Sequence, residues 1–247
     1  MYSHSEMVEQ TFDALNEIKS DIIGFATNSK RSQQKALGAS DIAAPCDRRM
    51  AYKMLNMAPS NFSDPWYMII GTAVHAWLET CYKAKNKRLG RTRYLLEYKV
   101  KFGTGLSGRL DCFDTDNNSI IDWKVVGTST LKAASIDLNE VYTDQLCLYA
   151  KGLSDKGFTV EWLQIVFLPR NNQLSKSIMQ RVPFDIERAK AVLARHDAVK
   201  KTVKEHGVKA LSLLTTDASG CFFCPYYLSG SPLLTEGCSG AQDPITN

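Results

Sequence analysis

The sequence lacks any apolar run that approaches the roughly eighteen residues of a membrane-spanning helix. Its first twenty residues contain glutamates and aspartates and no apolar core segment, so a secretory leader is not expected. Internal repeats and low-complexity tracts are absent as well. We therefore expect a cytoplasmic protein that makes no contact with a membrane.

A strong charge of either sign is also missing. The net charge is +4 and the pI is about 8.6, which is compatible with nucleic-acid binding but does not demand it. With 247 residues, 44% of them hydrophobic, the chain can bury a full core as one domain with appendages. We expect a helical N-terminal part (1–60), a core (61–210) and a Cys-rich tail (211–247).

The order of the expected elements predicts an α/β fold with a mixed central sheet flanked by helices. Helices are expected within 6–26, 40–57, 65–89, 143–153 and 185–206, and strands at 95–102, 106–114, 119–126, 160–168 and 175–184. Asp64 is the expected N-cap of the third helix, with Pro65 at its first position and Gly90 at its end.

Two of these strands predict a hairpin that carries charges. If Asp114 pairs with Ser119, antiparallel pairing places Asp111 directly opposite Asp122. Lys124 shares the side of Asp122 because side chains alternate along a strand. The strand around them is nearly continuously apolar, so the charges are not expected to be solvated. Because opposed like charges are destabilising, a divalent metal between the carboxylates is predicted.

Further polar groups lie on the neighbouring helices. Gly71, His75 and Glu79 are four residues apart and share one helix face, and the glycine predicts close approach of another backbone there. Gln145 and Tyr149 are spaced in the same way. A basic run is either a solvated surface or a candidate phosphate-contacting patch: Lys83, Lys85, Lys87, Arg88, Arg91 and Arg93.

From about Ser40 to the C-terminus the chain resembles a known family. The motifs GTAVH, GRLD, DWK and QLCLY, in this order, are similar to those of the RecB-type PD-(D/E)XK nucleases. The resemblance implies a restriction-endonuclease-like core and a catalytic set of Asp111, Asp122, Lys124, Gln145 and Tyr149. It implies Mg²⁺ or Mn²⁺ held by His75, Asp111, Asp122 and the carbonyl of Trp123, with Glu79 and Glu97 as further candidate carboxylates.

Four cysteines near the two ends have the spacing of a four-thiolate site, either iron-sulfur or zinc: Cys46, Cys221, Cys224 and Cys238. Disulfides are the poorer account, because seven cysteines is an odd number and the expected context is cytosolic. The other three are expected in the core: Cys81, Cys112 and Cys147.

The four-cysteine pattern resembles the iron-sulfur branch of the RecB-type nucleases, which includes CRISPR-adaptation exonucleases and the AddB nuclease domain. It implies a [4Fe-4S] cluster, with structural Zn²⁺ as the alternative, that joins the N-terminal helices to the tail. The spacing between Cys224 and Cys238 is longer than is usual in that branch.

The resemblance implies a metal-dependent DNA exonuclease acting on single-stranded DNA or free ends. Its implied setting is recombination, repair or CRISPR adaptation in a bacterium or a phage, with protein partners from those pathways. A non-catalytic DNA-binding scaffold subunit of the same fold is one alternative, disfavoured by the intact catalytic set. A site-specific endonuclease is the other, disfavoured because no added base-reading domain is seen.

Overall fold

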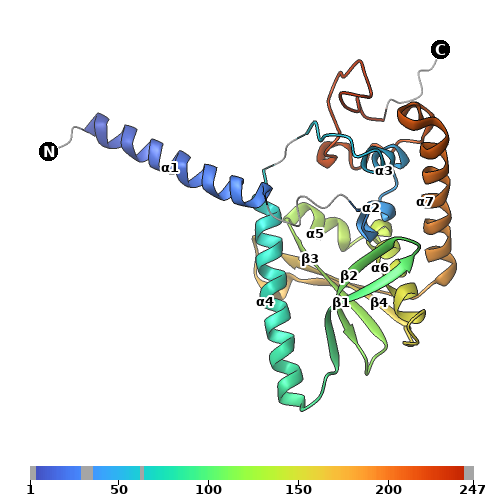
Figure 1. The fold of residues 1–247 in the computed structure, drawn as a ribbon. Helices are drawn as coiled ribbons and strands as arrows, with labels where there is room; N and C mark the ends of the chain where they lie inside the picture. The colour runs from blue at the N-terminus through green and yellow to red at the C-terminus, as the bar shows by residue number, and fades with distance from the viewer. Residues whose placement is uncertain (1–3, 29–35, 62–63, 242–247) are drawn as a thin grey trace.

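The computed structural model describes residues 4–28, 36–61 and 64–241, with side chains from residue 12 onward. A five-stranded sheet lies at its centre, in the order β1-β2-β3-β4-β5 (Figure 1). The strands are β1 (Tyr94–Gly103), β2 (Leu106–Asp114), β3 (Ser119–Val126), β4 (Trp162–Pro169) and β5 (Ile178–Pro183). Only β3 and β4 pair in parallel. The expected α/β fold with a mixed sheet flanked by helices is confirmed.

The hairpin of β2 and β3 has the bounds predicted from the sequence. Asp114 pairs with Ser119 as expected, and the pairing continues only as far as Cys112 and Ile121. Beyond that point β3 continues its parallel pairing with β4. The two strands of the hairpin therefore separate just where the predicted carboxylates begin.

Helices precede and follow the strands along the chain, and α1 projects away from the sheet (Figure 1). Their bounds are α1 (His4–Thr27), α2 (Ala39–Ala43), α3 (Asp47–Met54), α4 (Trp66–Leu89), α5 (Thr128–Ala134), α6 (Glu140–Ser154), α7 (Ile186–His206) and α8 (Ala210–Leu213), and three short 3-10 turns are η1 (Leu174–Lys176), η2 (Gly207–Lys209) and η3 (Cys221–Phe223). The single helix expected over 40–57 was wrong, because Pro45 separates α2 from α3. Helix α5 was not predicted.

The predicted ends of α4 are nearly right. The helix begins one residue later than expected, with Pro65 in the N-cap position, and the Asp64 carboxylate accepts a hydrogen bond from the backbone N–H of Trp66 at 2.8 Å. Gly90 ends the helix with a left-handed backbone, φ +66°. Both α1 and α4 have 24 residues, but no helix in the described residues is long and apolar enough to cross a membrane.

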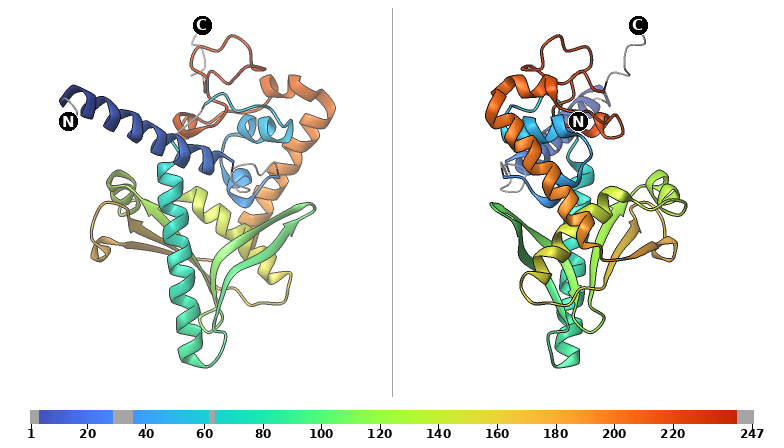
Figure 2. Two further views of the ribbon diagram at one scale, coloured as in Figure 1. Left: turned by 60° about the vertical axis from the view of Figure 1, so that its left-hand side comes forward. Right: turned by 90° about the vertical axis from the view of Figure 1, so that its right-hand side faces the viewer.

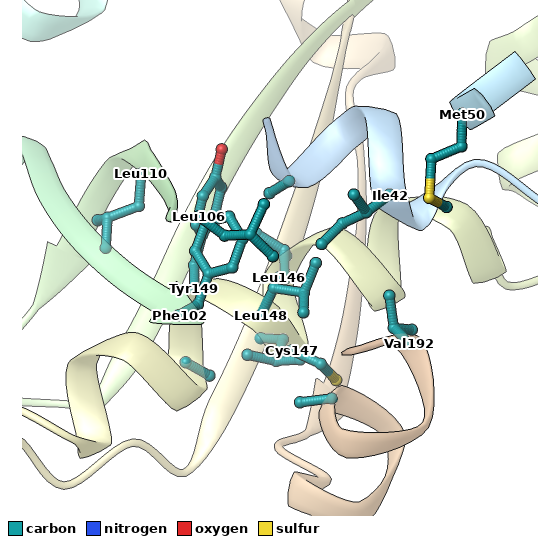
Figure 3. Packing of buried hydrophobic residues seen from close by; sticks show 14 of the residues in the cluster. Ile42, Met50, Phe102, Leu106, Leu110, Leu146, Cys147, Leu148, Tyr149 and Val192 are labelled. Carbon is teal, nitrogen blue, oxygen red and sulfur yellow. The ribbon is translucent and has the colours of Figure 1, made fainter. Parts of the chain in front are cut away.

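Different helices cover the two faces of the sheet (Figures 1 and 2). Leu78 and Tyr82 of α4 pack on a small cluster that includes Ile121 and Trp123. Helix α6 packs on the opposite face, with α2 and α7 in the same larger core (Figure 3). Residues on alternating sides of β3 thus face α4 or α6.

The Cys-rich tail packs against α3. The ring of Tyr226 stacks on Tyr52 with centroids 4.9 Å apart, and the Tyr52 hydroxyl donates to the carbonyl of Leu234 at 2.6 Å. An isolated β-bridge joins Tyr227 to Cys238. Residues 242–247 of the predicted tail lie outside the described residues. Apolar and hydrogen-bonding contacts therefore hold this tail in addition to any role of its cysteines.

Candidate active site and cysteine pocket

Asp111 lies where β2 separates from β3. Its Oδ2 accepts a hydrogen bond from the backbone N–H of Trp123 at 2.9 Å, and its Oδ1 lies 3.4 Å from Nδ1 of His75 on α4. The predicted direct opposition of Asp111 and Asp122 was therefore wrong, because the ladder ends one residue earlier and Asp111 binds the next backbone amide instead. His75 and Asp111 are nevertheless brought together, as the motif order implied.

Asp122 and Lys124 form a buried ion pair. Their Oδ2 and Nζ atoms are 2.8 Å apart, and the two side chains are only 4% and 19% exposed. Lys124 also donates to Oε1 of Gln145 at 3.3 Å and lies 4.6 Å from the ring centroid of Tyr142. The structure thus confirms that Asp122 and Lys124 share one side of β3, and it places Gln145 beside them.

The site has more negative than positive charge. Burial, and then the nearby Asp111 carboxylate, raise the pKa of Asp122 despite its ion pair. Burial alone would lower the pKa of Lys124, but the Asp122 carboxylate outweighs it and the pKa is raised. The hydrogen bond to Asp111 is the main cause of the raised pKa of His75. The pKa is thus raised for all three groups, by burial first for Asp122 and by neighbouring carboxylates for Lys124 and His75.

Glu97 on β1 lies close to His75 and Asp111 and is a further potential metal ligand. One ligand atom each from His75, Glu97 and Asp111 lies within 4.8 Å of the others, and no other such group of three or more occurs in the described residues. Glu79, the other candidate carboxylate, forms an ion pair with Lys83 at 2.6 Å. Glu97 therefore lies among potential metal ligands, whereas Glu79 is paired with a lysine.

Tyr149 reaches the site past a glycine. It is buried between β2 and α6, where its ring lies edge-on to Phe102 (Figure 3), and burial raises its pKa to about 12. A Cβ atom on Gly108 would lie 2.8 Å from Cε1 of Tyr149. The glycine of the GRLD motif thus makes room for this tyrosine. Gly71, in contrast, would meet nothing within 4 Å, so the predicted close approach there was wrong.

We expect Gly108→Ala to lower the free energy of unfolding by about 1–3 kcal/mol, because the buried Tyr149 ring has to move. Gly71→Ala is the matched control, and here we expect a gain of about 0.5–1 kcal/mol, because alanine is the better helix former and the space is open. Thermal unfolding of both variants measures the effect. A Gly108→Ala protein as stable as the wild type would contradict the steric account.

Most cations of the predicted phosphate-contacting patch contact other residues of the protein. Arg91 and Arg93 make paired hydrogen bonds with the carboxylates of Asp116 and Asp114. Lys85 lies over the rings of Tyr82 and Tyr94, and Lys83 is paired as described above. Lys87 and Arg88 form no ion pair with the described residues, so two of the six cations stay available for a ligand.

All four predicted ligand cysteines line one pocket, together with Arg49 and Tyr52 of α3. Cys46 is the N-cap of α3, and its Sγ accepts a hydrogen bond from the backbone N–H of Arg49 at 3.4 Å. Arg48 Nη1 donates to Sγ of Cys238 at 3.6 Å. Residues 175 positions apart, Cys46 and Cys221, are thus brought to the same place, as the spacing predicted.

The other cysteines differ from one another. Cys112 and Cys147 are fully buried, and burial raises the pKa of their thiols to about 12 and about 11, as expected for core residues. Cys81 is exposed on α4, so its predicted core position was wrong. It lies one helical turn after Trp77, which is 70% exposed.

One site residue was missed from the sequence. Tyr142 precedes Gln145 by three residues on α6, and its ring contacts the Lys124 ammonium. This i, i+3 spacing places Tyr142 and Gln145 on one helix face, and it can be recognised from the sequence. The carbonyl of Trp123 remains a predicted ligand, whereas its backbone N–H and its buried ring have structural contacts.

No protein-family model matches this sequence, and no curated protein matches it significantly. Among solved structures, the chain is similar to an alkaline exonuclease from Laribacter hongkongensis (16% identity, TM-score 0.46, 72% of this chain and 96% of that one). The same enzyme in complex with dAMP matches at 14% identity and TM-score 0.46 over 72% and 95% of the chains. A phage-related exonuclease from Haemophilus somnus 129PT matches at 14% identity and TM-score 0.45, over 67% and 92%.

Proposed function

We propose that this protein is a metal-dependent DNA exonuclease that hydrolyses phosphodiester bonds from DNA ends. One observation carries the proposal: two carboxylates, a histidine and a buried lysine gather where β2 separates from β3. Hydrolysis of a phosphodiester needs a positioned water and positive charge for the phosphate oxygens, and this set of groups suits both needs. Gln145 and Tyr149, next to the lysine and the β2 backbone, complete it.

The donor set fits a divalent cation such as Mg²⁺ or Mn²⁺. His75 and Asp111 offer an imidazole nitrogen and carboxylate oxygens, and the carboxylate of Asp122, paired with Lys124, would be a further ligand. The bound ion would supply Lewis-acid activation of water and of the phosphate. His75 and Asp111 already form a contact that fixes the orientation of both side chains.

Lys124 is proposed to orient the attacking water and to offset negative charge. Its raised pKa keeps it protonated, so it acts as a hydrogen-bond donor and not as a base in this arrangement. Gln145 holds the Lys124 ammonium through its side-chain oxygen. Tyr149 is proposed to contact a base or sugar face of the strand that is cut.

Digestion of labelled DNA tests the proposed activity. With Mg²⁺ or Mn²⁺ we expect linear DNA, labelled at its 5′ or 3′ end, to be degraded progressively, while covalently closed circles stay intact. DNA binding should weaken steeply with salt and show little sequence preference, because phosphate contacts and stacking would dominate.

Two results of this experiment would contradict the proposal. Cutting of closed circles at discrete sites would favour the endonuclease alternative. DNA binding without cleavage, in the presence of either metal, would favour the scaffold subunit. The product ladders from the two labels also reveal the polarity.

We further propose that the four-cysteine pocket holds an iron-sulfur cluster. The four thiols line one pocket, and the thiolates of Cys46, Cys221, Cys224 and Cys238 suit either an iron-sulfur cluster or zinc, with the resemblance to the iron-sulfur branch favouring the cluster. Cys46, Cys221, Cys224 and Cys238 would hold it, and Arg48 and Arg49 offer positive charge beside it.

A further inference from the structure

Glu97 has an unusual backbone. It lies inside strand β1, yet its φ is +47°, in the left-handed region that a glutamate seldom adopts. The β1–β2 ladder passes from the pair Leu96–Cys112 directly to Tyr98–Leu110. Glu97 and Asp111, which face each other in that register, are the two residues left out of it.

The side chain of Glu97 also lacks a protein partner. Its carboxylate is half-buried and makes no hydrogen bond or ion pair with any described residue. Its oxygen nevertheless lies within 4.8 Å of a ligand atom of His75 and of Asp111. Charged groups of both signs lie near this carboxylate, the carboxylates of Asp111 and Glu79 and the cationic side chains of His75 and Arg109, but none of them forms an ion pair with it. A half-buried carboxylate that lies close to a second carboxylate and an imidazole, and that is paired with no cation, is a position that a metal ion would complete.

We infer that Glu97 is a direct ligand of the divalent cation, together with His75 and Asp111. The inference rests on the proposed nuclease function. It also bears on the choice of metal, because an imidazole nitrogen beside two carboxylates suits Mn²⁺ better than Mg²⁺, which prefers oxygen ligands alone. Glu79, one helical turn from His75, is not assigned as a ligand, because its carboxylate lies outside this group and pairs with Lys83 instead.

The test measures Mn²⁺ binding without DNA, by the loss of the free-ion signal in electron paramagnetic resonance. We expect Glu97→Gln, which keeps the shape of the side chain but removes its charge, to weaken Mn²⁺ binding at least about tenfold. Glu79→Gln, the matched control on the rival carboxylate, should bind Mn²⁺ as the wild type does. Mg²⁺ should displace Mn²⁺ from the wild type only in large excess.

A second variant separates ligand loss from damage to the fold. Asparagine tolerates the left-handed backbone better than glutamate does, so Glu97→Asn should unfold at the same or a higher temperature while losing Mn²⁺ binding. Wild-type affinity in both Glu97 variants would overturn the assignment. If the wild type binds Mn²⁺ and cuts DNA in that case, the proposed function stands. A wild type that neither binds Mn²⁺ nor cuts DNA would overturn both.

Discussion

Replacing Lys124 with alanine is expected to abolish DNA cleavage, by at least about a hundredfold, while Mn²⁺ and DNA binding remain largely intact. The reason is that Lys124 is proposed to act on the water and the phosphate and not to hold the metal. Its ammonium lies 2.8 Å from Asp122 and 3.3 Å from Gln145, so its position is fixed before substrate binds. Cleavage rates, Mn²⁺ titration and DNA affinity measure the three effects separately.

The control for this variant is Lys151→Ala. Lys151 also lies on an element of the site, α6, and is paired with Asp155 at 2.6 Å, but that pair is at the surface. Surface ion pairs contribute little, so cleavage and stability should hardly change. Appreciable residual cleavage by Lys124→Ala would rule out the proposed role of the lysine.

Replacing Cys46 with serine is expected to remove the colour of the protein. Protein purified without oxygen should be brown, as thiolate-bound iron-sulfur centres are, and Cys46→Ser or Cys221→Ser should be colourless. Because the binding free energy of such a group contributes to folding, the tail should also become sensitive to protease. Absorption spectra, iron and sulfide analysis and limited proteolysis follow these changes.

Controls for the cysteine experiment come from the same chain. Cys81→Ser, Cys112→Ser and Cys147→Ser should keep the colour, because none of these residues lines the pocket. One zinc and no iron in the wild type would exclude the cluster and leave the four-thiolate site. A colourless, metal-free protein with a stable tail would exclude both.

The sequence predicts the hairpin and its register well, because alternating burial and a four-residue turn leave few alternatives. Asp114 and Ser119 pair as expected. The end of the β2–β3 ladder could not be predicted in the same way. It depends on where β3 stops pairing with β2 while it continues to pair with β4. Long-range pairing of this kind has no local signal, and neither has the left-handed backbone of Glu97.

The errors at α2, α3 and α4 have different causes. The break between α2 and α3 has a local signal, because a proline such as Pro45 is not tolerated inside a helix. The exposure of Cys81 and the open space at Gly71 depend on how α4 lies on the sheet, which its apolar pattern does not determine, since no residue of α4 is fully buried. The cysteine pocket was predictable because ligand spacing is a chemical pattern that persists across distant segments.

The order in which the two sites leave the ribosome follows from the placement of their residues. His75 to Tyr149 lie in one continuous stretch, so the residues of the candidate active site are synthesised together and their contacts close short loops. The cysteine pocket cannot form until Cys221, 175 residues after Cys46, has also been synthesised. A chain that stops before Cys221 would therefore contain every residue of the candidate active site but lack three of the four cysteines of the proposed cluster site.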